Sequence, residues 1–280
     1  IYSFGDIGEL TYPYEVIQNK TDIIKKIVEE KHDLSEIIKN SKKPIIILGQ
    51  SALKIKSSKY IFTELKRFLE KNDKINNEWQ SLNILSNNAS TVGAYDLGLI
   101  NPDNSENFTL KSIKDNEFDI IFLFGQDNLK FIKKNEFIIY VGSHGDRGAE
   151  LADLVLPGSA YTEQDGYFTN LEGKIQKAYK ASYPPGEAKE DWEIINNLSE
   201  LIKRKKIFKN KDELIDSMFN YLKLNSSSDT NYMFDTNFFD EKIIVDNPNY
   251  YFSNVIARAS KTMADCNNAK IKLKKTGTEG

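Results

Sequence analysis

The sequence is poor in the residues that build metal centres. Its 280 residues include one cysteine, Cys266, and two histidines, His32 and His144. A single cysteine excludes a disulfide within the chain and an iron–sulfur cluster ligated by this chain alone. Two histidines exclude a multi-histidine metal site. The shortage of cysteine also favours a reducing compartment.

Long apolar runs and a large excess of charge are missing as well. The longest apolar runs, "FDIIFLFG" and "PIIILG", have the length of strands and fall short of the roughly 20 residues that a membrane-spanning helix needs. Arginine occurs only four times and the net charge is −3 at pH 7, which does not fit the basic footprint of a nucleic-acid-binding protein. The chain starts at Ile1 inside an apolar run, and we expect no signal or transit peptide.

What the chain does contain is a series of short apolar runs that stop at a glycine. Runs of four to six residues rich in Ile, Val, Leu and Phe, without polar alternation, are typical of strands covered on both faces. We therefore predict strands of a parallel sheet in the segments 1–5, 43–52, 118–127, 136–145 and 152–160.

Amphipathic stripes predict helices between and after these strands. The predicted helices lie in 21–30, 33–40, 57–70, 77–90, 190–206 and 211–224. Asp33, with Glu36 three residues on, predicts a capping box at the start of one of them. Strands that alternate with helices predict an α/β fold with an open, mostly parallel, Rossmann-like sheet.

The same patterns divide the chain into three segments. We predict an α/β sheet layer over 1–160, a loop plus helices of the same domain over 161–224, and a helical and irregular C-terminal extension over 225–280. Residues 161–189 are predicted to be irregular, because "SYPPGEA" cannot continue a helix or a central strand. "NSSSDTN" at 225–231 predicts a polar loop.

Glycine stops mark the edge of the predicted sheet where a ligand would bind. In open parallel sheets, ligands bind beyond the carboxyl ends of the strands. Glycine permits close approach of a ligand, but it also makes the tight turn from strand to helix. No stop completes GxGxxG or a Walker A loop, which favours the turn. The stops are Gly49-Gln50-Ser51, Gly125-Gln126-Asp127, Gly142 to Asp146, and Pro157-Gly158-Ser159.

Several titratable side chains follow these stops. His144 and Asp146 form a candidate acid–base pair, and Arg147 a candidate anion contact. No nucleophile accompanies them at an informative spacing, so a histidine bonded to its loop neighbours is the favoured alternative. Weaker candidates are the carboxylates Glu163, Asp165 and Glu172, then Ser159, which lies outside a GxSxG motif, and Cys266, which has no activating neighbour.

Segment 138–200 carries a family resemblance. "ADLVLP" at 152–157 followed by "TNLEGKIQ" at 169–176 is similar to the signature of the molybdopterin oxidoreductase superfamily. "HGD" at 144–146 and "PPGEAKEDWEII" at 184–195 resemble its complex I branch, namely the C-terminal part of the large iron–sulfur (75-kDa) subunit of respiratory complex I. Stretches that agree in order lie at 10–15, 42–53, 82–98 and 254–266.

The resemblance implies a partial molybdopterin oxidoreductase-like domain. In that family an N-terminal region carries the cysteines that ligate iron–sulfur clusters, and none of that region is in this sequence. The resemblance thus implies the C-terminal half of a split subunit, a non-redox structural part of the peripheral (matrix) arm of NADH:ubiquinone oxidoreductase, which is a complex of the mitochondrial inner membrane.

Further expectations follow from the resemblance. We expect no catalytic, cofactor-binding or metal-binding residue and no cofactor bound by this chain. The iron–sulfur clusters are expected on the partner N-terminal half. The other expected partners are peripheral-arm subunits, with no nucleic acid and with membrane contact only through the complex. Residues Thr169 to Gly173, which help to shape a cofactor cavity in active molybdoenzymes, are expected to be scaffold here.

Two other functions remain open. A fragment of an active molybdenum or tungsten pterin oxidoreductase, such as formate dehydrogenase, would hold a pterin dinucleotide between the glycine stops and 169–173. A free-standing nucleotide-binding α/β enzyme is disfavoured by the incomplete phosphate motifs. For Arg258 in "ARAS" a fork-like contact and a solvated side chain are equally open.

Overall fold

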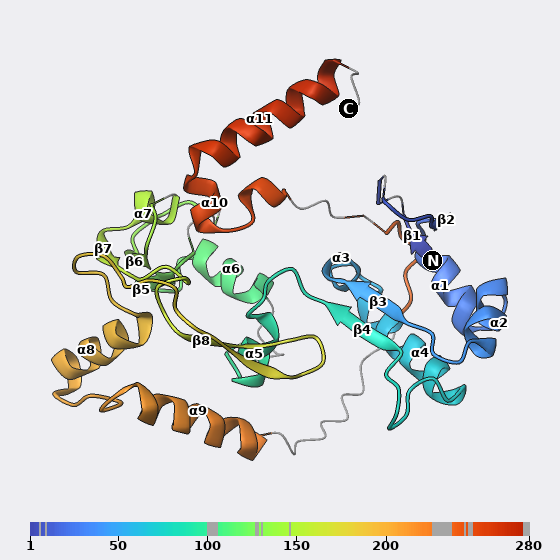
Figure 1. Ribbon diagram of the computed structural model, residues 1–280, viewed down its shortest axis with the longest axis horizontal. Helices are drawn as coiled ribbons and strands as arrows, with labels where there is room; N and C mark the ends of the chain where they lie inside the picture. The colour runs from blue at the N-terminus through green and yellow to red at the C-terminus, as the bar shows by residue number, and fades with distance from the viewer. Residues whose placement is uncertain are drawn as a thin grey trace. The chain divides into compact units, whose positions relative to one another are not determined.

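The computed structural model describes the chain except for residues 6, 9, 100–105, 127, 128, 130, 146, 226–236, 244, 246–248 and 277–280, and the side chains of 106–109, 225 and 273–276. It forms two compact units (Figure 1). Unit 1 comprises Ile1–Val92, Thr169–Lys174 and Ser228–Asn247; unit 2 comprises Gly93–Phe168, Ile175–Ser227 and Pro248–Gly280.

Unit 1 contains two parallel strand pairs and their helices. Strand β1 (Tyr2–Phe4) pairs with β2 (Glu15–Ile17), and β3 (Ile46–Gly49) pairs with β4 (Leu82–Leu85). The helices are α1 (Thr21–Val28), α2 (Asp33–Asn40), α3 (Gln50–Leu53) and α4 (Ser58–Lys71).

The core of unit 1 lies between the β3–β4 pair and the apolar stripes of α1 and α4. The stripes supply Ile23, Ile24 and Ile27 from α1 and Ile61, Leu65, Phe68 and Leu69 from α4. Ile46 and Leu82 pack against them from the strands. This is the burial that the amphipathic sequence pattern predicts for helices that cover one face of a sheet.

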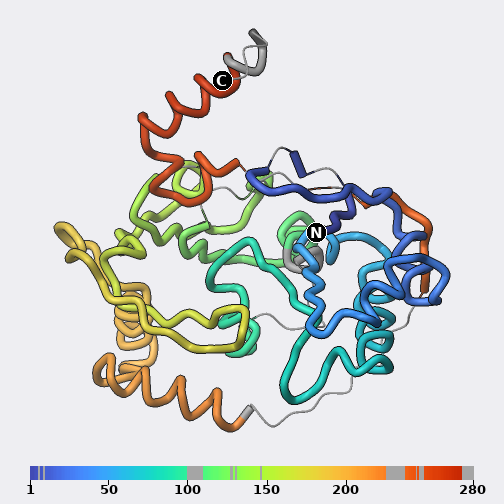
Figure 2. The backbone as a smooth tube through the Cα atoms, turned by 45° about the vertical axis from the view of Figure 1, so that its right-hand side comes forward, coloured from blue at the N-terminus to red at the C-terminus, as the bar shows by residue number. Residues whose placement is uncertain are grey.

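A segment from the far end of the chain ties the two helices together. The Thr21 and Ser57 hydroxyls each donate to the Phe239 carbonyl oxygen at 2.8 Å, and the Ser57 amide donates to the Glu241 carboxylate at 2.7 Å. Ile243 is buried in the same core. Figure 2 shows this segment, in orange, beside α1 and α4. Thr21 and Ser57 are fully buried, so these bonds satisfy polar groups that are out of reach of water.

Unit 2 is built on a three-stranded parallel sheet in the order β5–β6–β7. The strands are β5 (Ile120–Phe124), β6 (Phe137–Gly142) and β7 (Leu154–Pro157). One face packs Ile121, Leu123, Ile138 and Tyr140 against Ile113 of α6 (Glu106–Lys114). Ala149 and Leu151 of α7 (Arg147–Leu151) join this core.

The remaining elements of unit 2 are a hairpin and helices. They are α5 (Thr91–Asp96, across the unit boundary), β8 (Gly166–Thr169), β9 (Ile175–Ala178), α8 (Asp191–Lys203), α9 (Lys211–Asn225), the 3₁₀ turn η1 (Tyr250–Phe252), α10 (Val255–Ala259) and α11 (Lys261–Thr276). Buried Asn196 holds the connection from α8 to α9, because its side chain accepts from the Ile207 and Phe208 amides and donates to the Phe208 carbonyl oxygen.

The α/β fold with mostly parallel pairing is confirmed. Each of the five predicted strand segments contains a strand, and the paired strands form four small sheets. The three sequence segments 1–160, 161–224 and 225–280 stay a prediction. Among the described residues, no helix has the length and apolar character needed to cross a membrane.

Three local predictions are wrong. The helix predicted over 77–90 is strand β4 at its centre, and the predicted irregular segment 161–189 contains the β8–β9 hairpin. The capping box at Asp33 is not formed, because His32 is the N-cap and its Nδ1 accepts from the Leu34 amide at 3.1 Å. The polar loop predicted over 225–231 lies, apart from the backbone of its first residue, outside the described residues.

Leu69 tests the core of unit 1. Leu69→Ala removes a fully buried side chain and leaves a cavity, so we expect it to lower the free energy of unfolding by about 2–5 kcal/mol. Urea unfolding followed by Trp79 emission in a Trp192→Phe background reports on unit 1. The control is Ile37→Ala, because the Ile37 side chain on α2 is exposed. We expect this variant to lose under about 1 kcal/mol of unfolding free energy. Equal losses in both variants would contradict this packing.

Candidate functional site

The carboxyl edge of the β5–β6–β7 sheet is where an open parallel sheet would hold a ligand. The strands end side by side here, and the backbone ladder continues into the glycine stops. The Gly125 amide donates to the Val141 carbonyl oxygen at 2.8 Å, and the Gly158 amide donates to the Gly142 carbonyl oxygen at 3.1 Å. These two amides are therefore already used by neighbouring strands and are not free to hold an anion.

The Tyr140 side chain occupies the space beside two other glycines, Gly142 and Gly148. Its ring is almost completely buried, and its hydroxyl donates to the His144 carbonyl oxygen at 2.7 Å. A Cβ atom on Gly142 would clash with the Tyr140 hydroxyl oxygen, and one on Gly148 would lie 3.0 Å from the ring and clash with the Gln126 carbonyl oxygen. The two glycines thus make room for a side chain of this chain.

Among the described residues of the 143–147 loop, His144 and Arg147 have no partner in common. His144 Nδ1 lies 3.0 Å from the Ser143 hydroxyl, its neighbour in the loop, and Arg147 is exposed at the start of α7. Asp146, the other member of the candidate acid–base pair, lies outside the described residues. Elsewhere, half-buried Arg258 donates to the Phe252 carbonyl oxygen at 3.2 Å.

The three candidate carboxylates each have their own local partners. Glu163 accepts from the Ala160 amide at 2.9 Å. Asp165 accepts from the Lys180 amide at 2.8 Å, and this bond holds the pKa of the Asp165 carboxyl below its usual value. Glu172 lies 3.5 Å from the Asn170 side-chain amide. Glu163 and Asp165 therefore stabilise the local backbone through side-chain-to-backbone bonds, whereas the partner of Glu172 is a side chain of the same turn.

The turn over Thr169 to Gly173 closes the β8–β9 hairpin. The Asn170 side-chain oxygen accepts from the Glu172 amide at 3.0 Å and from the Lys174 amide at 2.9 Å. Gly173 has φ +78°, a conformation that favours glycine. These donors satisfy the turn itself, as in an Asx turn.

A pterin dinucleotide does not fit the described residues of this edge. Such a ligand carries phosphates that need several free donors, whereas the Gly125 and Gly158 amides already donate within the chain. Buried Ser159 has a hydroxyl without a partner among the described residues, and a single hydroxyl does not replace that set. Among the residues that the structure describes, no three His, Cys, Asp or Glu side chains form a group that holds a metal ion. Cys266 is exposed.

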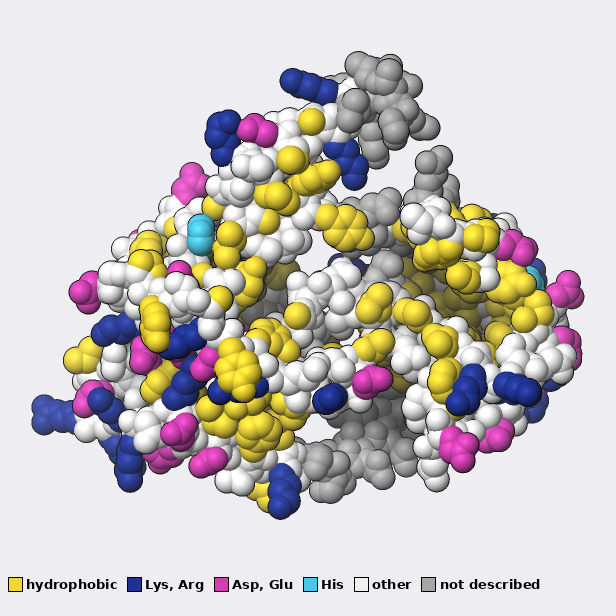
Figure 3. Space-filling model, viewed as in Figure 1, with side chains coloured by type: hydrophobic (Ala, Val, Ile, Leu, Met, Phe, Trp, Pro, Cys, Tyr) yellow, Lys and Arg dark blue, Asp and Glu magenta, His cyan; other side chains and the backbone are white. Residues whose placement is uncertain are grey.

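Sequence analysis missed a pocket of about 510 Å³ in unit 2. Its wall is mainly apolar and comes from Leu97, Leu99, Tyr167, Trp192, Phe208, Leu214, Ile215, Met218 and Tyr221. Figure 3 shows hydrophobic side chains gathered over α5 and α9 and charged ones over α8. The sequence predicted the helices that carry Trp192 and the stripe of α9, but it did not predict that Leu97, Leu99 and Tyr167 join them, because these residues are far apart in the chain.

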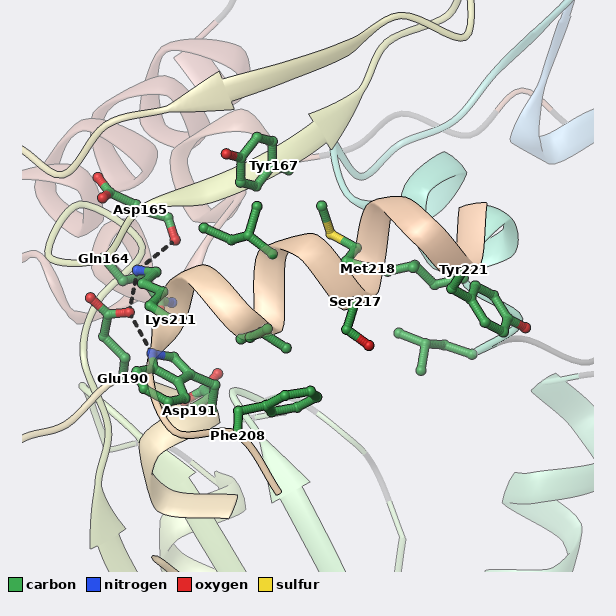
Figure 4. A pocket seen from close by; sticks show the side chains of 15 residues that line it. Gln164, Asp165, Tyr167, Glu190, Asp191, Phe208, Lys211, Ser217, Met218 and Tyr221 are labelled. Atoms are coloured by element: carbon green, nitrogen blue, oxygen red, sulfur yellow. Dashed lines mark hydrogen bonds and ion pairs between the residues drawn. The ribbon is translucent and has the colours of Figure 1, made fainter. Parts of the chain in front are cut away.

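One end of this pocket is charged. Lys211 forms an ion pair with Glu190, and its ammonium lies 3.4 Å from the Asp165 carbonyl oxygen. The Trp192 indole also donates to Glu190, at 3.0 Å. Figure 4 shows this group at the start of α9 and Tyr221 towards its other end. Burial, and secondly the charge of Glu190, raises the pKa of the Asp191 carboxyl. The Lys211–Glu190 pair is thus bonded within the chain, so its evident role is to join α8 to α9.

Gly148 tests whether the edge is filled by Tyr140. Gly148→Ala places a methyl group against Tyr140 and the Gln126 carbonyl oxygen, so we expect a loss of about 1–3 kcal/mol in unfolding free energy. Urea unfolding read from Trp192 emission in a Trp79→Phe background measures it. Gly145→Ala is the control, because its methyl group would meet only Ala149 at 3.7 Å. A loss in Gly145→Ala as large as in Gly148→Ala would contradict this packing.

Lys211 tests the charged end of the pocket. Lys211→Met leaves the Glu190 carboxylate buried without its cation, and we expect a loss of up to about 3 kcal/mol in the same Trp192 measurement. Adding Glu190→Gln removes the unpaired charge, and we expect the double variant to recover most of the lost unfolding free energy. Lys206→Met, which breaks an exposed pair with Glu200, is expected to cost under about 1 kcal/mol. No recovery in the double variant would refute the assignment.

Two family models match segments of the chain. Residues 1–201 match the family model for molybdopterin oxidoreductase, and residues 232–266 match that for the C-terminal region of the G subunit of NADH-ubiquinone oxidoreductase. The chain is 34% identical over 279 residues to the NADH-ubiquinone oxidoreductase 75 kDa subunit of Reclinomonas americana, covering 95% of this chain and 40% of the relative.

Two further relatives have similar names. The chain is 33% identical to the G subunit of the NADH-quinone oxidoreductase of Rickettsia bellii, over 98% of this chain and 40% of the relative. It is 34% identical to the mitochondrial NADH-ubiquinone oxidoreductase 78 kDa subunit of Candida albicans, over 83% of this chain and 34% of the relative. The chain spans about two fifths of the length of these relatives. It belongs to the molybdopterin oxidoreductase family, in the branch formed by the large subunit of respiratory complex I.

Proposed function

We propose that this chain is a redox-inactive structural part of the peripheral arm of NADH:ubiquinone oxidoreductase. The observation that carries the proposal is that this chain matches the large subunit over nearly the whole length of the chain. Residues 232–266 also match the family model for the C-terminal region of that subunit. Electrons would pass from NADH to quinone through centres on other parts of the complex.

The chemistry of the chain supports a role without a redox centre. One cysteine cannot supply the four thiolates of an ordinary iron–sulfur cluster. The carboxyl edge of the main sheet, where a nucleotide or pterin would bind, is packed with Tyr140 and with backbone bonds of the chain. The proposed contribution is therefore mechanical: the chain supports the cluster-bearing region and keeps neighbouring subunits in position.

The proposed partners follow from the relatives. The matched region is about 40% of the R. americana protein, so we propose that the cluster-bearing remainder of the large subunit is the main partner, whether on the same or a separate polypeptide. Other peripheral-arm subunits complete the contacts. The proposed location is the matrix side of the mitochondrial inner membrane, with membrane contact only through the complex.

A tagged chain tests the proposal. We expect a C-terminal tag, expressed in the organism of origin, to migrate on native gels with the band that oxidises NADH. The purified material is expected to contain iron, the cluster-bearing region of the large subunit in equal amount, and no stoichiometric molybdenum or tungsten. Untagged cells processed in parallel provide the control.

Two outcomes would overturn the proposal. A tag that migrates apart from NADH-oxidising activity would remove the assignment to the complex. Stoichiometric molybdenum or tungsten, with a fluorescent pterin released on denaturation, would favour the alternative of an active pterin oxidoreductase.

A further inference from the structure

The β5–β6–β7 sheet has two faces that differ sharply in exposure. The pairing register places Ile121, Leu123, Ile138 and Tyr140 on one face, where each is at most 9% exposed, with Val155 of the edge strand β7, which is 50% exposed. Ile120, Phe122 and Phe137 lie on the opposite face with Leu154 of β7, and their exposed fractions are 56%, 39%, 46% and 42%. Among the described residues, the core formed with α6 and α7 covers the side of β5 and β6 that carries Ile121 and Tyr140.

The open face is apolar throughout. The register assigns it Ile120, Phe122, Phe124, Phe137, Ile139, Val141, Leu154 and Leu156. No charged or polar side chain of these strands interrupts it. Phe122 and Phe124 stack at 6.1 Å between ring centroids. A face of this composition is not suited to water, since sheets that face solvent alternate apolar and polar residues.

The exposure is concentrated at one end of the face. Val141, near the carboxyl ends of the strands, is buried, and Phe124 and Leu156 are half-buried, whereas Ile120, Phe137 and Leu154 at the amino ends are the open residues. Small-molecule sites of open α/β sheets lie beyond the carboxyl ends. The open area is therefore at the wrong end for such a site and has the character of a packing surface.

The β3–β4 pair of unit 1 shows a weaker version of the same feature. Ile45, Ile47 and Leu85 are exposed there, but the register places polar Asn83 beside Ile47. The unbroken apolar face of β5–β6–β7 is therefore the stronger candidate for a surface that another element must cover.

We propose that the open face of β5–β6–β7 is covered by an amphipathic helix from the part of the large subunit that lies outside the region matched here. This inference rests on the proposed function. Parallel sheets carry helices on both faces, and the R. americana relative has most of its length outside the matched 40%. Strands about 4.8 Å apart and a helix about 10 Å wide mean that one helix spans this three-stranded face.

Photo-crosslinking in the assembled complex tests the occupant. Phe122 is replaced by its benzophenone analogue, which keeps the face apolar, and tagged complex is irradiated. We expect a crosslink to a segment of the cluster-bearing region that has apolar residues at i, i+3, i+4 and i+7. The same analogue at Ile202, which is 70% exposed on α8, is the control and is expected not to give that product. A crosslink to residues 1–92, to a second copy of this chain, to another subunit, or to no protein would overturn the inference.

A charge on the face gives an independent measurement. Ile120→Glu introduces a carboxylate that the covering helix would have to desolvate, so we expect at least a tenfold loss of tagged chain from the NADH-oxidising band. Ile202→Glu is the matched control and is expected to incorporate like the wild type. Equal incorporation of both variants would overturn the inference. If the unmodified chain itself were absent from the band, the proposed function would fail instead, so the two failures are distinguishable.

Discussion

A parallel sheet is stable only when both of its faces are covered, and this constraint governs most of what the structure shows. Strands β5, β6 and β7 are apolar on both sides, because no polar residues alternate with the apolar ones in their sequences. The chain covers one side with Ile113 of α6 and with Ala149 and Leu151 of α7. The open apolar side is the surface for which we propose a covering helix.

The site-like motif between 138 and 176 is explained by the same packing. Glycine at 142 and 148 normally indicates close approach of a ligand, but here it permits close approach of the Tyr140 ring. Asn170 and Gly173 shape a turn that is satisfied by its own backbone bonds. Turns and close packing demand the same residues as a phosphate cradle, so a motif of this kind does not by itself indicate a ligand.

Much of the fold was predictable from the sequence, and the errors have identifiable causes. Strands β5, β6 and β7 were predicted because runs of β-branched and aromatic residues that end in glycine have few other interpretations. The strand β4 was assigned to a helix because Trp79, Leu82 and Leu85 also fit a helical spacing, and a four-residue strand is too short to decide.

The remaining errors needed information from distant residues. The β8–β9 hairpin was missed because its turn, at Asn170, depends on side-chain bonds and not on a Pro-Gly or Asn-Gly pair. At the candidate site, the sequence identified the glycine stops but not their occupant, since Tyr140 looks like any strand residue. The pocket beside α9 could not be predicted from the sequence, because the residues that meet there are far apart in the chain. Lys211 and Glu190, for example, lie 21 positions apart.

The bonds from Phe239 and Glu241 to the beginnings of α1 and α4 have a consequence for biosynthesis. These contacts join residues that are 182 to 220 positions apart, so the early helices leave the ribosome well before the segment that completes them. At a synthesis rate of about 5–20 residues per second, the nascent chain waits on the order of ten seconds or more with Thr21 and Ser57 unpaired. The cores of α1 and α4 are therefore completed only after most of the chain has been synthesised.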